Sequence, residues 1–109
     1  MKNLGTKGTP LFRRLWTLCR DIPKGKVAAY NYLAQQIGKP KAGRVVAMAM
    51  ARNPYAPDVP CHRVIRADGS LGGYSAKGGV ARKRSLLTKE GIRFDPNGKV
   101  LPDFVLKSR

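Results

Sequence analysis

The chain has 109 residues, and its 22 lysines and arginines outnumber 6 aspartates and glutamates to give a formal net charge of +16. This length holds about one domain and excludes a multidomain enzyme. The sequence contains no run of about 18 apolar residues and no apolar stretch near its start. We therefore expect no membrane span, no signal peptide and an intracellular location, either cytoplasmic or, in a eukaryote, nuclear.

The charge favours a polyanionic partner, and nucleic acid is the first candidate because cationic side chains release counterions from phosphates. An anionic membrane is the weaker alternative, since the basic residues are scattered among glycines and prolines instead of following one amphipathic helix. A basic chromatin or ribosome-associated protein is the general alternative. Cys19 and Cys61 lie 42 positions apart, and one histidine cannot complete a four-ligand structural zinc site with them, so we expect no metal. We expect no cofactor.

The first helix is predicted to begin at Thr9 and Pro10, a cap residue followed by a first-turn proline. Apolar residues then recur at helical spacing and predict one buried face, formed by Leu11, Leu15, Leu18 and Ile22. Cys19 falls within this face. We interpret it as a small core residue and not as a nucleophile.

Two further helices are predicted on either side of a short turn. The first carries Leu33 and Ile37 and ends at Gly38, and the second runs from about Ala42 to Arg52. This order is typical of a helix-turn-helix. Basic residues surround the turn and the second helix, which favours DNA over RNA: Lys39, Lys41, Arg44 and Arg52.

Residues 53–79 are rich in proline, glycine and aspartate, and we expect loops there, with a hairpin turn at 66–69. A last helix is predicted from about Val80 to Glu90, followed by a tail that turns at 96–98. The expected fold is mainly α: a small helical bundle with a winged-helix-like helix-turn-helix and a short β-hairpin element. We expect one domain over 1–109, with a core at about 9–92 and a C-terminal extension at 93–109.

Cys61 and His62 follow Pro60 within the loop-rich region, and prolines hold this segment in an extended or turn conformation that is stiff enough to present a thiol to a pocket. Neighbouring side chains on an extended segment point to opposite faces, so adjacency alone does not make a nucleophile and base pair. Glu90, the single glutamate, falls at a helix C-terminus, where the helix dipole disfavours a carboxylate. It is either the carboxylate that orients the histidine or a solvated surface residue.

A resemblance to one family rests on ordered blocks of residues. Pro60-Cys61-His62-Arg63-Val64 is similar to the active-site pentapeptide of the O6-alkylguanine-DNA alkyltransferases, also called methylated-DNA–protein-cysteine methyltransferases. Further blocks agree over about residues 9 to 92: 22–27 with Tyr30 and 33–34, then 42–46, 53–54, 72–75, 86–87 and 90–91. The resemblance is to the C-terminal catalytic and DNA-binding domain of that family.

The resemblance implies DNA repair by stoichiometric, irreversible transfer of an alkyl group from guanine O6 to Cys61 after base flipping. His62 resembles the base that acts on the thiol through a bound water, and Glu90 the carboxylate that orients the imidazole. Asn53 is similar to the asparagine that braces the turn before the active site. The implied partner is double-stranded DNA containing O6-alkylguanine, bound by a monomer with no role for a membrane.

The resemblance also implies how DNA and the base are held. Arg44 resembles the finger that fills the vacated base stack, and Tyr30 the residue that crowds the adjacent phosphate. Small residues at Ala42, Gly43 and Ala47 suit a helix in the minor groove. The carbonyls of Cys61 and Val64 and the N–H of Ser75 would read the guanine edge, while Tyr74 and Met50 line the alkyl pocket. Core packing is the alternative for Met50 and Ala47.

Departures from the family pattern leave one alternative function. Few residues precede the first helix, so we expect no N-terminal domain, and residues 76–77 look like an insertion in the loop over the base. Stand-alone domains of this length resemble the alkyltransferase-like proteins, which bind lesions without repair. Those proteins replace the acceptor cysteine, whereas this chain keeps Cys61.

Overall fold

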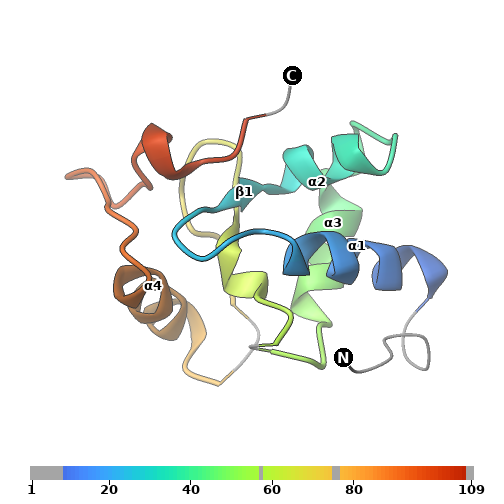
Figure 1. The fold of residues 1–109 in the computed structure, drawn as a ribbon, viewed down its shortest axis with the longest axis horizontal. Coiled ribbons are helices and arrows are strands. Elements are labelled where there is room, and N and C mark those ends of the chain that lie inside the picture. The colour runs from blue at the N-terminus through green and yellow to red at the C-terminus, as the bar shows by residue number, and fades with distance from the viewer. Residues whose placement is uncertain (1–8, 57, 75–76, 108–109) are drawn as a thin grey trace.

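A computed structural model describes residues 9–56, 58–74 and 77–107 (Figure 1). Within these ranges the elements are α1 (Pro10–Arg20), β1 (Ala28–Ala29), α2 (Tyr30–Gln36), α3 (Gly43–Ala51), η2 (Cys61–Arg63), β2 (Val64–Ile65), α4 (Gly79–Lys89) and η3 (Pro102–Phe104). The predicted mainly α fold is confirmed, with each helix within one or two residues of its expected bounds. No helix in the described part of the chain is long and apolar enough to cross a membrane.

Local signals account for the start of α1 and the helix-turn-helix. The Thr9 hydroxyl accepts a hydrogen bond from the backbone N–H of Phe12 at 3.1 Å and so caps α1. Gly38, with φ at +75°, takes the left-handed conformation that ends α2. Trp16 of α1 donates its indole N–H to the carbonyl of Ala49 at 2.8 Å, which fixes α1 across α3. The first core forms where these three helices meet.

The strand pairing differs from the expected hairpin. β1 and β2 run parallel, with Ala28 opposite Val64 and Ala29 opposite Ile65. The turn at 66–69 does form, since the N–H of Gly69 donates to the carbonyl of Arg66 at 3.0 Å, but it does not return β2 to an antiparallel partner strand. Residues 36 positions apart pair here, and a local turn signal cannot predict such a pairing.

The short strand pair separates two hydrophobic cores. Ala28 and Val64 face the core of α1, α2 and α3, whereas Ile65 and the preceding Val27 face a second core that includes Leu87 of α4. This alternation follows from the two-residue period of extended backbone. The strand pair therefore fixes where α4 lies relative to the helix-turn-helix.

The tail beyond α4 folds back onto the strand pair (Figure 1, orange to red). Phe94 and Val100 form an antiparallel bridge around the predicted turn at 96–98. Val105 then bridges Val27 in parallel, and the N–H of Leu106 donates to the carbonyl of Val27 at 2.8 Å. Val100 is buried in the second core and Leu106 packs against the first, so the tail through residue 106 is part of the packed structure.

Candidate active site

Cys61 lies in the wall of a cavity of about 390 Å³. Its side chain is only 5% exposed, and it begins the one-turn 3₁₀ helix η2, so the segment adopts the turn and not the extended alternative expected from its prolines. The N–H of Cys61 donates to the carbonyl of Val59 at 2.8 Å, which closes the turn around Pro60. Seven further residues line the cavity: Tyr30, Ala47, Met50, Ala51, Arg66, Gly73 and Tyr74.

Asn53 braces the loop that leads from α3 to Cys61. Its side-chain amide donates to the carbonyl of Val59 at 2.8 Å, and its side-chain oxygen accepts from the N–H of Tyr55 at 2.9 Å. Burial raises the pKa of the Cys61 thiol, while the Asn53 side chain and the charge of Lys83 act in the opposite direction. The thiol is therefore mainly protonated at neutral pH and needs a base to react.

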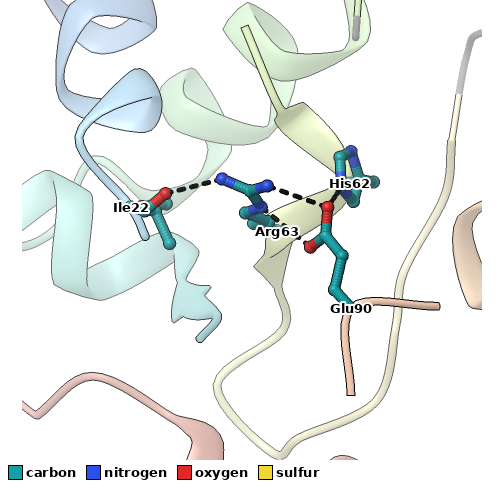
Figure 2. A network of polar contacts seen from close by, with 4 residues as sticks. All are labelled: Ile22, His62, Arg63 and Glu90. Atoms are coloured by element: carbon teal, nitrogen blue, oxygen red, sulfur yellow. Dashed lines mark hydrogen bonds and ion pairs between the residues drawn. The ribbon is translucent and has the colours of Figure 1, made fainter. Parts of the chain in front are cut away.

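His62 and Glu90 are in direct contact, as Figure 2 shows. The Nε2 atom of His62 lies 3.0 Å from Oε2 of Glu90, the residue that caps the C-terminus of α4. Arg63 completes the group: its Nε donates to Oε1 of Glu90 at 2.9 Å and its Nη2 to Oε2 at 2.8 Å. Glu90 is thus no solvated surface residue, because two side chains of the Cys61–Arg63 turn hold its carboxylate.

The protonation of this group follows from burial and pairing. Burial would raise the pKa of Glu90, but hydrogen bonds from Arg63 and His62 outweigh it and lower the pKa, so the carboxylate is charged. Burial lowers the pKa of His62 against the opposing effect of Glu90, so the imidazole is neutral at pH 7. Its Nδ1 atom is buried and has no hydrogen-bond partner among the described residues.

Lys83 is a feature that the sequence analysis missed. Its side chain is 1% exposed, and its ammonium donates to three main-chain carbonyls: Val64 at 2.8 Å, Gly73 at 3.2 Å and, at the shortest distance, Leu71. Burial lowers its pKa to about 8. The sequence of α4 does not indicate that Lys83 is buried, because one lysine among several basic residues is typical of a surface position.

The exposed side of α3 continues into the cavity. Ala47 and Ala51 line the cavity, and Arg44 and Met48 are exposed on the same helix. These four positions follow the i, i+3, i+4, i+7 spacing and therefore share one helical face. Ala42 and Gly43, at the start of α3, are half-buried. A methyl group added to Gly43 would meet no atom within 4 Å, so internal packing does not explain this glycine.

The remaining predicted substrate residues fall in different places. Tyr30, Met50 and Tyr74 line the cavity, and burial raises the pKa of both tyrosines. Val64 is buried in the first core, and its carbonyl already accepts a hydrogen bond from Lys83. Ser75 and the expected insertion residue Ala76 lie outside the described residues.

The fold and site together define a class: a helix-turn-helix domain in which a cysteine lines a cavity beside a histidine–carboxylate pair. This chain belongs to the family described as 6-O-methylguanine DNA methyltransferase, DNA binding domain, which matches residues 10–92. That description gives the domain's type and not its place in longer relatives, so the expected C-terminal position is not confirmed by it.

Named relatives agree with this family. The chain is 48% identical over 87 residues to the bifunctional transcriptional activator/DNA repair enzyme Ada of Escherichia coli, covering 80% of this chain and 24% of Ada. It is 47% identical over 90 residues to the methylated-DNA–protein-cysteine methyltransferase of Mycobacterium tuberculosis, covering 83% of this chain and 53% of that protein. The chain therefore spans about half the length of that methyltransferase.

Solved structures show the same fold. Mycobacterium tuberculosis OGT in complex with DNA aligns with a TM-score of 0.73 at 48% identity, over 77% of this chain and 51% of OGT. S. pombe Atl1 in complex with damaged DNA containing O6-carboxymethylguanine aligns with a TM-score of 0.78 at 27% identity, over 94% of this chain and 100% of Atl1. The two neighbours differ in how much of their own length this chain covers.

Proposed function

We propose that this protein repairs DNA by transferring an alkyl group from guanine O6 to Cys61, irreversibly and once per molecule. The observation that carries this proposal is the position of the Cys61 thiol in a cavity wall next to the His62–Glu90 pair. Relatives named methylated-DNA–protein-cysteine methyltransferase, at 47% to 50% identity, support the same reaction.

The chemistry is an in-line displacement. The Cys61 thiolate attacks the alkyl carbon, a carbon–sulfur bond forms, and the bond from that carbon to O6 breaks with its electron pair leaving on the base. N1 then takes a proton from water, which restores guanine, and the proton that His62 accepts from the thiol returns to solvent. The thiol proton passes to Nδ1 of His62 through a bound water, while the Nε2–H of His62 stays with Glu90. The carbon–sulfur bond of the resulting thioether is not cleaved under these conditions, because the thiolate is a poor leaving group from an alkyl carbon, so the protein is consumed.

The cavity provides the contacts for the base. Tyr74 and Met50 form the wall next to the alkyl group, and their apolar surfaces favour an uncharged methyl or larger substituent. The carbonyls of Cys61 and Val64 read the guanine edge together with the N–H of Ser75. The Val64 carbonyl can do so while bonded to Lys83, because a carbonyl oxygen carries two lone pairs.

Double-stranded DNA is the proposed partner, bound along the exposed face of α3. A reaction at O6 inside a duplex requires the nucleotide to rotate out of the stack. Arg44 is exposed on this face and fills the vacated position, while Tyr30 crowds the neighbouring phosphate. The open space around Gly43, with Ala42 and Ala47 nearby, lets the helix backbone approach the minor groove closely.

Intact-mass measurement tests the proposal. The protein is incubated with duplex DNA that contains O6-methylguanine, and we expect the mass of one methyl group per protein, located on Cys61 by peptide mapping. Cys61→Ala is the matched control and gains no mass. Transfer of more than one equivalent, or a methyl group on Cys19, would contradict the mechanism.

Recognition of alkylated bases without transfer is the second candidate. It is favoured by the similarity to Atl1, which extends over the whole of that chain and 94% of this one. Under this alternative the protein binds the duplex with O6-methylguanine more tightly than undamaged DNA and stays unmodified. The same mass measurement therefore decides between the two candidates when it is paired with a binding assay.

A further inference from the structure

Arg63 has no part in the reaction proposed above, yet its guanidinium is bonded through three nitrogens. Two of them grip the Glu90 carboxylate, and Nη1 donates to the carbonyl of Ile22 at 2.8 Å (Figure 2). Ile22 lies just after α1, on the opposite side of Arg63 from Glu90. The side chain therefore ties the end of α4 to the first core through the turn that carries Cys61.

The hydrogen bonds to the Glu90 carboxylate determine which nitrogen of His62 carries the hydrogen. A charged carboxylate accepts hydrogen bonds only, and a guanidinium only donates them. Glu90 thus receives three hydrogen bonds, two from Arg63 and one from Nε2 of His62. Nε2 must carry the hydrogen, which leaves the lone pair of the neutral imidazole on Nδ1, the atom without a partner in the described residues.

The guanidinium also limits how strongly Glu90 charges the imidazole. An unpaired carboxylate in contact with a histidine stabilises the imidazolium form. Burial has the largest effect on the pKa of His62 and lowers it, Glu90 raises it, and Arg63 and Lys83 lower it further. Arg63 pairs with the same carboxylate and offsets its charge. The Arg63 side chain is only 16% exposed, so solvent screens this pairing little.

We propose that Arg63 is a positioning residue of the transfer site: it fixes the Glu90 carboxylate against His62 and keeps the imidazole neutral, with Nδ1 free to take the thiol proton. A histidine that was already protonated at neutral pH could not accept that proton. The consequence for transfer rests on the proposed function, whereas the state of His62 can be measured without it.

The other ionisable groups around His62 do not replace Arg63. Lys83 of α4 adds a second positive charge, but it is bonded to main-chain carbonyls and not to Glu90. The thiols of Cys61 in the same turn and Cys19 of α1 have pKa values raised by burial and stay neutral at pH 7. Next to burial, Glu90 and Arg63 are therefore the pair of charges that sets the pKa of the imidazole.

The test uses the fact that His62 is the single histidine of the chain, so its imidazole signals in an NMR titration need no further assignment. Arg63→Met removes the charge and keeps a long side chain. We expect the pKa of His62 to rise by about one unit, since removal of a nearby positive charge leaves the carboxylate unbalanced. Arg93→Met, at an exposed arginine after α4, is the control and leaves the titration unchanged.

The pH dependence of the transfer rate distinguishes this role from a purely structural one. In Arg63→Met the rise of the transfer rate with pH should begin about one unit higher than in the wild type, so that the loss is about tenfold well below the pKa of His62, only about two- to threefold at pH 7, and largely gone at pH 8.5. An equal loss at every pH, or an unchanged His62 titration in the folded variant, would overturn the proposal. Arg63→Gln keeps a donor for Glu90 without the charge and should shift the titration in the same direction if Arg63→Met does not fold.

The outcomes separate this inference from the proposed function. If the wild type transfers no alkyl group while Arg63→Met shifts the His62 titration, the proposed function fails and the effect of Arg63 on His62 stands. If the wild type transfers and neither variant shifts the titration, the role of Arg63 fails alone.

Discussion

The two cysteines show how different two buried thiols of one protein can be. Both belong to the first core, and Cys19 is 0% exposed while Cys61 is 5% exposed. Burial raises the pKa of both thiols, and it does so far more strongly for Cys19. Cys19 lies on the inner face of α1 among apolar side chains. Cys61 lines a cavity, and Asn53 and the charge of Lys83 oppose the effect of burial there.

The comparison teaches that exposure alone does not identify a reactive thiol. A difference of a few per cent in exposed area separates these residues, but only Cys61 has a cavity in front of it and a histidine next to it. Access for a substrate and polar groups that stabilise the thiolate decide reactivity, because the thiolate and not the thiol is the nucleophile.

The largest expected difference lies between the two alanine substitutions. Cys61→Ala should abolish alkyl transfer completely, because no other thiol reaches the cavity in the described structure. Cys19→Ala should transfer one equivalent, as the wild type does, and lose stability by about 1 kcal/mol from the small space left in the core. Transfer is measured by intact mass and stability by urea unfolding. Transfer by Cys61→Ala would remove the distinction between the two thiols.

Iodoacetamide should sharpen the comparison, with Cys61 reacting on the order of a thousandfold faster than Cys19. Modification of Cys19 requires opening of the core, which costs several kcal/mol in a domain of this size. Because the pKa of Cys61 is raised, its thiolate fraction should grow about tenfold per pH unit through the neutral range, and so should its rate. Peptide mapping over time measures both residues at once. Similar rates in the folded protein would contradict the assignment of Cys19 to a closed core.

Arg44→Ala should slow repair of duplex DNA by about tenfold or more and leave transfer from the free base O6-benzylguanine nearly unchanged. Only the duplex requires a base to be unstacked, at a cost of a few kcal/mol that an inserted side chain offsets. Arg93→Ala is a suitable control for the loss of one surface charge. Equal losses on both substrates would mean that Arg44 acts on the cavity or the fold instead of on the DNA.

The smallest expected effect is that of Glu90→Gln, which removes the negative charge that contacts His62, the residue next to Cys61. We expect transfer at pH 7 to fall several-fold, because an amide stabilises the imidazolium formed during the reaction less than a carboxylate does. Stability should fall by ~1 kcal/mol, since Arg63 loses its charged partner. The stabilising contribution of Glu90 is present above the pKa of an unfolded glutamate and is lost as the pH falls through its lowered folded pKa. Rates and unfolding midpoints at pH 7 and below pH 4 measure both effects.

The contribution of Glu90 to stability could not be predicted from the sequence. The helix dipole alone predicts that a carboxylate at the end of α4 destabilises the protein, so that its removal should be neutral or favourable. The structure leads us to expect the opposite sign, because Arg63 binds both carboxylate oxygens from 27 positions away in the sequence. The unfavourable effect of the helix dipole on the carboxylate is smaller than the stabilisation from a half-buried ion pair with two hydrogen bonds.

The sequence by itself determined the helices, the buried place of Cys19 and the segment that carries Cys61. These features depend on neighbours within a few residues: the Thr9 cap, the apolar spacing of α1, and the prolines before the Cys61 turn. Only the tertiary structure decided the parallel pairing of β1 with β2, the contacts of Glu90 with His62 and Arg63, and the burial of Lys83. Such contacts join residues far apart in the chain, and their energy depends on desolvation and geometry that exist only after the two cores have packed.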